Sequence, residues 1–416
     1  MIEWSEQHEQ IGTMIRRFVE TEIKPKIEEL EFGDTPPYEV LRKMVKIFGL
    51  REMARAQFQA RIAKERARQE TAEEGEAAED KPRKPRDPEE AANEMAMRIL
   101  PIIELSRYSP GMVTALGVSM GLTASAIMSR GTIAQKERWA LDLLTLDKIG
   151  AWAITEPGAG SDAFGAMKAT ARRDGNGGYI LNGSKTFITN GPYADTTVFI
   201  CKLDEGNPPE ERKVLSFVLD QGMEGFTQTK PFRKMGLHSS PTGEMFLDDV
   251  KVGKDRLLGE TEEAPGRKSA KETFTAERTA VAAMALGIVE QCQKLCVEYA
   301  KTRVQFGKPI GEFQLIQLKL ADMEVARMNI QNLVFRQIEM AAHGKSMSLA
   351  EASACKLYSA QAAMQVCLEA VQLFGGYGYM SEYQVEQLCR DAKVLQIYGG
   401  TDELQIVNIA RDLLKD

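Results

Sequence analysis

Residues 153–162, Ala153-Ile-Thr-Glu-Pro-Gly-Ala-Gly-Ser-Asp162, form the most informative stretch of the 416-residue sequence. A proline and two glycines stand among small polar residues, a composition typical of a loop whose backbone approaches a ligand closely. On spacing alone, a plain surface turn fits equally well. The stretch lacks both GxxxxGK[ST] and GxGxxG, so neither a P-loop nor a Rossmann phosphate turn is supported.

The sequence on either side of this stretch divides into three regions. Residues 1–147 carry apolar side chains at three- and four-residue steps, which indicates helices. Residues 148–255 carry short apolar runs separated by Gly, Pro and Asp, which indicates strands. Residues 256–416 return to the helical period, most clearly over 280–301 and 312–343. We therefore expect an N-terminal helical domain, a middle β domain and a C-terminal helical bundle within these bounds.

Two local patterns refine this outline. Asn182-Gly183 lies between two apolar runs, a signal typical of a β-hairpin turn. Residues 61–90 hold 18 charges, 8 positive and 10 negative, with three prolines and few large apolar side chains. Such a segment buries too little surface to offset its ordering entropy. We expect a helix as far as about Glu70, then a disordered or solvated excursion, within a charged insertion of about 61–95. A tolerated insertion is the simpler interpretation, and partner docking is the alternative.

Composition excludes several classes of protein. The net charge of −7 argues against a nucleic-acid surface, which needs clustered positive charge. No run of 18 uncharged apolar residues was identified, so we expect no membrane span. The acidic start lacks the pattern of a secretory signal. Six cysteines without CxxC spacing favour a reducing, cytoplasmic location and no metal site.

Seven motifs, in order, resemble those of the acyl-CoA dehydrogenase family. The resemblance covers about residues 1–50 and 97–416 and leaves mainly the charged insertion outside it. The motifs are Ala153–Asp162, Lys185-Thr-Phe-Ile-Thr-Asn-Gly191, Arg303-Val-Gln-Phe-Gly-Lys-Pro309, Phe313-Gln314, Gln372-Leu-Phe-Gly-Gly-Tyr-Gly-Tyr379, Arg390-Asp391 and Ile397-Tyr-Gly-Gly-Thr401.

This resemblance implies an α+β multidomain fold: an all-α N-terminal domain, a middle β-barrel-like domain and a C-terminal four-helix bundle. It implies FAD between the middle domain and the bundle, with a neighbouring subunit completing the site. A homotetramer, or at least a dimer, is therefore expected. The implied activity is oxidation of an acyl-CoA to a trans-2-enoyl-CoA in lipid metabolism, specifically fatty acid β-oxidation, with electrons passing to an electron-transferring flavoprotein.

The resemblance also assigns cofactor positions. Thr155 would hydrogen-bond the flavin ring, and Phe187, where many relatives have Trp, would cover it. From the residues alone, Phe187 fits plain core, Arg303 a solvated helix end, and Gly375-Gly376 a helix-terminating turn. Arginine suits a pyrophosphate because its planar fork donates two parallel hydrogen bonds. The full implied set is Ile154, Thr155, Gly160, Ser161, Phe187, Ile188 and Thr189 around the ring; Arg303, Gln305 and Phe306 at the pyrophosphate and adenine half; Gln314, Gln372, Gly375 and Gly376 from the partner subunit; and Thr401 and Glu403 closing the site.

The catalytic base departs from the commonest family pattern. Many members carry a glutamate where this chain has Gly399, which has no side chain and cannot act as a base. The long-chain and isovaleryl branches instead place the glutamate directly before an arginine on another helix, which matches Glu277-Arg278. We therefore predict Glu277 as the base; an exposed helical glutamate in a salt bridge is the alternative. The implied substrate contacts are Ser161, Arg278, Gly399 and Gly400.

Other interpretations stay open. An acyl-CoA oxidase, another flavoenzyme of this fold, or an inactive subunit of a mixed oligomer would share most of these motifs. His238 lies in a loop that is near the substrate in the family; a surface or structural role is favoured over an active-site role. Gln387 stands where relatives have a basic residue, which weakens a peripheral contact only.

Overall fold

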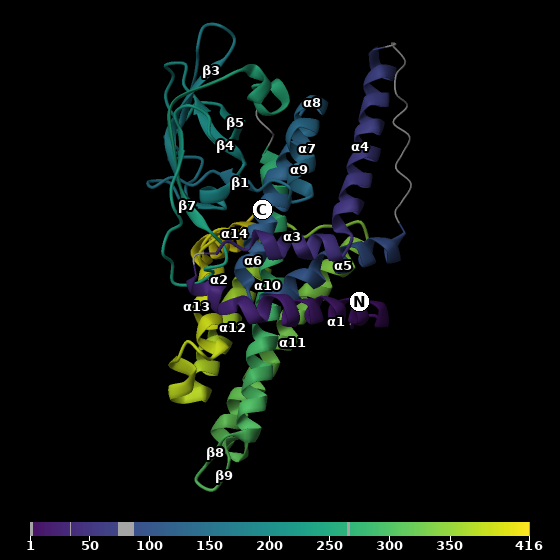
Figure 1. Cartoon of the computed structure of the whole chain (residues 1–416), viewed down its shortest axis with the longest axis vertical. Coiled ribbons are helices and arrows are strands. Elements are labelled where there is room, and N and C mark those ends of the chain that lie inside the picture. The colour runs from purple at the N-terminus through teal and green to yellow at the C-terminus, as the bar shows by residue number, and fades with distance from the viewer. Residues whose placement is uncertain (1–2, 34, 74–86, 264–266, 416) are drawn as a thin grey trace.

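The computed structural model describes residues 3–33, 35–73, 87–263 and 267–415, and Figure 1 shows their arrangement. A sheet occupies one part of the molecule, long helices extend away from it, and the N-terminal helices pack between the two. The predicted α+β multidomain architecture is confirmed. The helices before the sheet are α1 (Glu6–Phe18), α2 (Ile27–Phe32), α3 (Tyr38–Ile47), α4 (Leu50–Glu73), α5 (Pro88–Ser106), α6 (Pro110–Leu116), α7 (Ser125–Arg130), α8 (Ile133–Gln135) and α9 (Leu141–Leu144).

Helix α4 carries the first part of the charged insertion and stands apart from the bundle (Figure 1). The helix that was predicted as far as about Glu70 ends at Glu73. Ile62 is buried, and Glu65 pairs with Lys136 at 2.5 Å, so this part docks on the body of the protein. Residues 88–95 open helix α5, where Asp87 caps the first turn. The excursion predicted beyond Glu70 falls largely on residues 74–86, which lie outside the described residues.

The middle of the chain forms one seven-stranded sheet in the order β1-β4-β2-β3-β7-β6, with β5 paired to β4. Every residue of β4 is buried, which explains the apolar run Val198-Phe-Ile-Cys201 at its centre. The aromatic core of this sheet includes Phe199, Phe217 and Tyr179. The strands are β1 (Gly150–Ala153), β2 (Thr170–Arg173), β3 (Tyr179–Thr189), β4 (Thr196–Leu203), β5 (Val214–Asp220), β6 (Phe226–Gln228) and β7 (Thr242–Val252).

The predicted hairpin at Asn182-Gly183 is wrong. Strand β3 runs through both residues, and its register against β7 shifts between Leu181 and Gly183. Gly183 has φ +144°, and a Cβ there would lie 2.6 Å from the Cβ of Ala169. The glycine therefore permits a bulge and a close approach of backbone to side chain, rather than a chain reversal.

The C-terminal region is built around α10, a 36-residue helix that packs against α11, α12 and α5. A capping box at Ser348 starts α12, and Gly375, at φ +61°, ends it, as the helix-terminating interpretation predicts. The elements are α10 (Arg267–Thr302), β8 (Val304–Gln305), β9 (Lys308–Pro309), α11 (Gln314–Ala342), α12 (Leu349–Phe374), α13 (Gln384–Lys393) and α14 (Asp402–Leu413).

Within the described residues, two helical stretches, Pro110–Arg130 and Glu277–Thr302, are long and apolar enough to cross a bilayer by length and composition alone. The first corrects the expectation from the sequence, because residues 108–129 carry no charge. The fold buries 50% of the first apolar window and 67% of the second. The second stretch is the part of α10 that forms the centre of the bundle, so packing inside the protein accounts for its apolar character.

Asn190 joins the N-terminal helices to the sheet. Its backbone is left-handed (φ +64°), which asparagine tolerates better than most residues. The side-chain amide donates to the carbonyls of Ala115 and Gly150, both at 2.9 Å, and its oxygen accepts from the hydroxyl of Tyr38 at 3.0 Å. Because all these groups are buried, the amide fixes how β1 enters the sheet.

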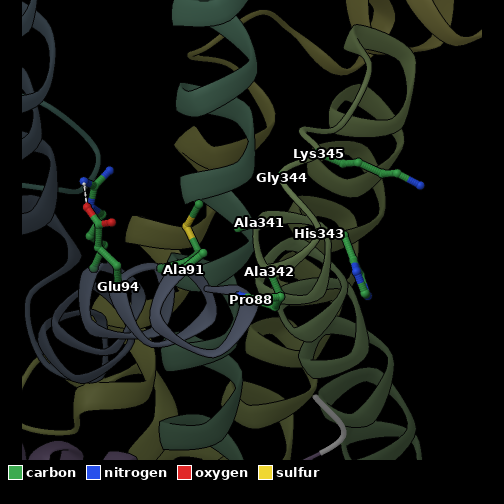
Figure 2. A pocket seen from close by; sticks show the side chains of 10 residues that line it. Pro88, Ala91, Glu94, Ala341, Ala342, His343, Gly344 and Lys345 are labelled. Carbon is green, nitrogen blue, oxygen red and sulfur yellow. Dashed lines mark hydrogen bonds and ion pairs between the residues drawn. The ribbon is translucent and has the colours of Figure 1, made fainter. Parts of the chain in front are cut away.

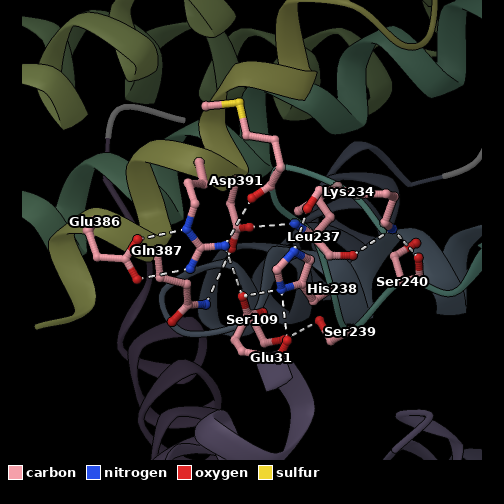
Figure 3. A network of polar contacts seen from close by, with 12 residues as sticks. Glu31, Ser109, Lys234, Leu237, His238, Ser239, Ser240, Glu386, Gln387 and Asp391 are labelled. Atoms are coloured by element: carbon pink, nitrogen blue, oxygen red, sulfur yellow. Dashed lines mark hydrogen bonds and ion pairs between the residues drawn. The ribbon is translucent and has the colours of Figure 1, made fainter. Parts of the chain in front are cut away.

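A second junction joins α2, the loop before β7 and α13 (Figure 3). His238 places both ring nitrogens against carbonyl oxygens, those of Glu31 at 2.8 Å and Lys234 at 2.7 Å. Since carbonyls only accept, both ring nitrogens donate. The Glu31 carboxylate, 3.3 Å from Nδ1, raises the pKa of His238. This arrangement agrees with a structural role for His238.

On the other side of the same junction, Asp391 accepts a hydrogen bond from the backbone N–H of Leu237 at 2.5 Å. Arg390 contacts Glu31 at 3.3 Å and Glu386 at 2.7 Å. Gln387 is buried and donates to the carbonyl of Tyr108 at 2.9 Å. A basic residue at position 387 would have to bury its charge there, so the departure at Gln387 belongs to this junction.

The bulge at Gly183 predicts a stability effect. We expect Gly183→Val to lower the free energy of unfolding by about 2 kcal/mol or more, because the added side chain overlaps Ala169 on a backbone that branched residues disfavour. Thermal unfolding measures the loss. Gly121→Ala is the control, since a Cβ there meets nothing within 4 Å. Equal melting temperatures for Gly183→Val and wild type would contradict the bulge.

Candidate functional site

Glu277 lies near the beginning of α10, with its carboxyl group directed at the turn formed by Gly399 and Gly400. A Cβ built on Gly399 would lie 3.5 Å from the Glu277 Cδ and 3.6 Å from its Oε1. The carboxylate therefore occupies the space beside position 399 that a side chain at that position would enter. Two segments 122 residues apart in sequence meet here, one supplying a carboxylate and the other only backbone.

Burial dominates the electrostatics of Glu277. The side chain is partly buried, and loss of hydration raises its pKa, while the cations of Arg278 and Lys356 act in the opposite direction. Tyr398 precedes the turn, and its hydroxyl contacts the Met284 sulfur at 3.3 Å. Burial and the Glu277 charge both raise the pKa of Tyr398, so it stays a neutral phenol. An exposed, salt-bridged glutamate does not fit this environment.

The turn itself is held from its buried side. Gly399 and Gly400 both have positive φ, +61° and +89°, which glycine adopts without strain. The Gln405 amide donates to the carbonyl of Gly399 at 3.2 Å and to that of Gly400 at 2.6 Å. Lys356 donates to the same Gly400 carbonyl at 2.6 Å. Thr401 then caps α14, so the turn is fixed between two helices.

Arg278 points into the same region. Its guanidinium is buried and donates to the Ser353 hydroxyl at 3.3 Å, and burial lowers its pKa while Glu277 opposes that effect. A Cβ on Gly400 would lie 3.6 Å from an Arg278 terminal nitrogen. Three of the predicted substrate contacts, Arg278, Gly399 and Gly400, therefore lie together, while Ser161 lies on the loop of the middle domain.

That loop is fixed by a buried ion pair. Glu156 accepts a hydrogen bond from the Lys185 ammonium at 2.8 Å and from the N–H groups of Lys168 and Ala169 at 2.6 and 2.9 Å. Lys185 also donates to the Ile154 carbonyl at 2.9 Å. Because its carboxylate is used in this way, Glu156 is a scaffold residue and not a second candidate base.

The loop and the end of β3 present a face to solvent. Phe187 is 68% exposed at φ +57°, with its ring 6.0 Å from that of Phe232, so the plain-core interpretation is wrong for this residue. Thr155 and Thr189 are partly exposed, and Gly160 and Ser161 are exposed. Ile154 and Ile188 are buried, so their side chains belong to the core.

Most of the remaining predicted cofactor residues lie at the opposite end of the bundle. Arg303 follows α10, with its guanidinium 5.5 Å from the centre of the Tyr377 ring, and Tyr299 stacks on Phe374 at 4.2 Å. From Glu277 to Arg303, α10 rises by about 39 Å at about 1.5 Å per residue. One chain therefore does not bring this group close to Glu277. The group comprises Arg303, Gln305, Phe306, Gln314, Gln372, Gly375 and Gly376, whereas Thr401 and Glu403 lie beside the Gly399 turn.

A hollow lies away from these residues. Its volume is about 520 Å³, and it lies between the start of α5 and the end of α11 (Figure 2). Its lining includes Pro88, Arg98, His343 and Lys345, and none of the predicted site residues. This hollow is therefore not the site that the motifs indicate.

Lys356 was missed by the sequence analysis. It is fully buried on α12 and contacts the Gly400 carbonyl beside the predicted base. A single lysine on a helix face of Ala352, Ala360 and Ala363 was the available signal, because an isolated cation among small apolar residues needs a specific partner.

The exposed groups suit a flavin dinucleotide. A Cβ on Gly158 or Gly160 would meet nothing within 4 Å, so the loop leaves open space beside its backbone. The exposed Phe187 ring offers a flat apolar surface to a planar ring system. Arg303 offers the planar fork that a pyrophosphate needs, although at the far end of the bundle. The residues therefore fit FAD, provided that a second copy of the chain contributes Arg303.

Comparison with known proteins gives consistent matches. The family model "Acyl-CoA dehydrogenase, C-terminal domain" matches residues 265–414, and the corresponding middle-domain model matches 151–250. A short-chain-specific acyl-CoA dehydrogenase of Megasphaera elsdenii is 42% identical over 76% of this chain and 81% of its own. The caffeyl-CoA reductase-Etf complex subunit CarC of Acetobacterium woodii is 33% identical over 99% of both. The solved butyryl-CoA dehydrogenase of M. elsdenii superposes with a TM-score of 0.83 over 100% of both chains at 34% identity.

The buried pair predicts a distinctive stability pattern. Lys185→Met should cost about 3–5 kcal/mol, because it leaves the Glu156 carboxylate buried and uncompensated. The double variant Lys185→Met/Glu156→Gln should recover part of that loss, since it removes both charges. Thermal unfolding and retained flavin are the measurements. Arg98→Met, in an exposed pair with Glu94, is the control and should change stability by about 0.5 kcal/mol or less. A similarly small effect of Lys185→Met would contradict the scaffold role.

Proposed function

The chain belongs to the acyl-CoA dehydrogenase family and is an oxidoreductase acting on CH–CH groups, and we propose that Glu277 is the base with which it converts an acyl-CoA to a trans-2-enoyl-CoA. The observation that carries this proposal is the position of the Glu277 carboxyl against Gly399. A family member with a glutamate at the turn itself would place its carboxylate at this position. In this chain the carboxylate reaches the same position from α10.

In the proposed reaction, an ionised Glu277 oxygen takes the proton from the carbon next to the thioester carbonyl. Bound FAD supplies the acceptor for the hydride that leaves the neighbouring carbon. A thioester α-proton is a weak acid, so the carbonyl oxygen has to be polarised as the proton leaves. The backbone N–H of Gly399 serves this purpose, since that contact needs no side chain. The raised pKa of Glu277 brings the base closer to neutrality, where proton transfer is most efficient.

The cofactor site is proposed to span two chains. The groups on the middle-domain loop and β3 would contact the ring end, and Arg303 with its neighbours would contact the pyrophosphate and adenosine end of a second copy's FAD. The length of α10 supports this division, because within a single chain Arg303 lies about 39 Å along the helix from Glu277. A homotetramer, or at least a dimer, follows.

Electrons are proposed to pass to an electron-transferring flavoprotein, in fatty acid β-oxidation and in the cytoplasm. The name of the A. woodii relative, which includes an Etf complex, supports the partner. Oxygen uptake separates this proposal from an oxidase: peroxide formed in proportion to turnover would identify the oxidase.

That relative's name also favours a second candidate, reduction of an enoyl-CoA. The same residues serve both directions, because a protonated Glu277 returns the proton that the carboxylate takes. Supplying the protein with an enoyl-CoA and a chemical reductant, and comparing the two initial rates, decides which direction it favours.

Substitution of the base is the sharpest test. Glu277→Gln should keep bound flavin and lose about 10³-fold in the rate at which a panel of acyl-CoAs bleaches the flavin anaerobically, because the amide cannot accept the proton. The relocated variant Glu277→Gly/Gly399→Glu should recover part of the rate, since its new side chain starts 3.5 Å from the original carboxyl. Glu277→Gln reacting as fast as wild type would remove Glu277 from the mechanism.

The pH profile follows from the pKa of the base. The carboxylate has to be ionised to accept a proton, so the bleaching rate should fall as the pH drops through the pKa of Glu277. Burial raises that pKa, so the fall should lie above the ordinary value of 4.5. Stopped-flow reduction between about pH 5 and 9 measures it. A flat profile across this range would contradict a raised pKa at the base.

A further inference from the structure

Among the residues that the structure describes, Lys185 and Lys356 are both fully buried, and their surroundings differ. Lys185 makes a 2.8 Å ion pair with Glu156. Lys356 donates instead to the Gly400 carbonyl at 2.6 Å, and Oδ1 of Asp402 lies 3.8 Å from its ammonium nitrogen. Its charge is therefore directed at the backbone of the catalytic turn and is only loosely compensated.

Several charged groups face Lys356. Asp402 and Glu403 on α14 and Glu277 on α10 favour its cation, whereas Arg278 on α10 disfavours it. Burial lowers the pKa of Lys356 to about 8, so the ammonium form is still the main one at neutral pH. From the side of Glu277, the facing charges are Arg278 and Lys356, and the neutral phenol of Tyr398 lies beside them.

Asp402 does not belong to Lys356 alone. Its Oδ2 accepts hydrogen bonds from Gln361 at 3.2 Å and Gln396 at 3.1 Å. These amides share the negative charge of Asp402, whose Oδ1 is 3.8 Å from the lysine ammonium. Asp402 is the strongest of the negative charges that favour the cation, and Glu277 is a weaker one. The direct hydrogen bond of the lysine goes to the Gly400 carbonyl, so the cation acts on the turn and on Glu277 as well as on Asp402.

We propose that Lys356 is a positioning residue for proton abstraction: its hydrogen bond fixes the Gly399–Gly400 turn, and its cation favours the ionised carboxylate of Glu277. The inference rests on the proposed function, because it assumes that Glu277 takes the proton. The lysine itself touches neither the substrate nor the cofactor in this account. It acts through the turn and through the charge of Glu277.

The two contributions are separable by substitution. Lys356→Gln can still donate to the Gly400 carbonyl but carries no charge, and Lys356→Met loses both. In the profile of bleaching rate against pH, the rate falls at low pH as Glu277 is protonated; we call this part the low-pH limb. Both variants should shift the low-pH limb to higher pH by about one unit. An opposite charge near a carboxylate lowers its pKa by about that much or more, and both variants remove that charge. Only Lys356→Met should also lower the rate on the high-pH plateau. Lys356→Arg keeps the charge, so its low-pH limb should lie at the same pH as in the wild type.

A matched control is available in the sheet. Lys202 is also buried and donates to a glycine carbonyl, that of Gly165 at 2.9 Å, but on β4. Lys202→Met should change stability and leave the position of the limb unchanged. Flavin content, measured for every variant, reports whether each one folds.

The outcomes are distinguishable. A wild-type limb in both Lys356→Gln and Lys356→Met, with bound flavin and active wild-type protein, would overturn the role of Lys356 and leave the proposed function standing. A shift of the same size in Lys202→Met would also overturn it, because the effect would then be general. If no acyl-CoA bleaches the wild-type protein, the proposed function and this inference fail together.

Discussion

A carboxylate held against a backbone turn is the constraint on which the rest of the site depends. The Glu277 carboxyl occupies the space that a long side chain at position 399 would enter, since a Cβ there would lie in contact, 3.5 Å from the carboxyl carbon. This turn needs positive φ at two successive residues, which Gly399 and Gly400 adopt. It also needs buried hydrogen-bond donors for its carbonyls, and Gln405 and Lys356 provide them. The missing side chain at position 399 and the glutamate on α10 therefore belong together, because the Glu277 carboxyl uses the space beside Gly399.

The length of α10 determines how far the turn at Gly399 lies from the Arg303 end of the bundle. Only the part of α10 after Glu277 separates the turn from the Arg303 end, where Phe306 is 94% exposed and Tyr379 80% exposed. These exposed aromatic side chains, next to an arginine suited to pyrophosphate, support the proposed contact with a second copy of the chain. The junctions at Asn190 and Asp391 fix the sheet against the helices, and so fix the loop at Thr155 relative to the bundle.

Sequence patterns predicted the large elements well because helical and strand periodicities report burial directly. They failed where one residue serves a long-range contact. Gly183 follows an asparagine, as in a hairpin turn, yet its missing Cβ accommodates Ala169. Phe187 resembles a core residue of a strand, but its positive φ turns it outward. Lys356 has no motif around it, and only the fold shows that it meets the Gly400 carbonyl.

The most direct test of the central claim separates proton abstraction from oxidation. The thioester 3,3-dimethylbutanoyl-CoA has α-protons but no β-hydrogen, so it can exchange protons without being oxidised. In D₂O, wild-type holoprotein should exchange these α-protons for deuterium, followed by NMR, and Glu277→Gln should exchange them no faster than buffer. Exchange at the wild-type rate in Glu277→Gln would show that another group removes the proton.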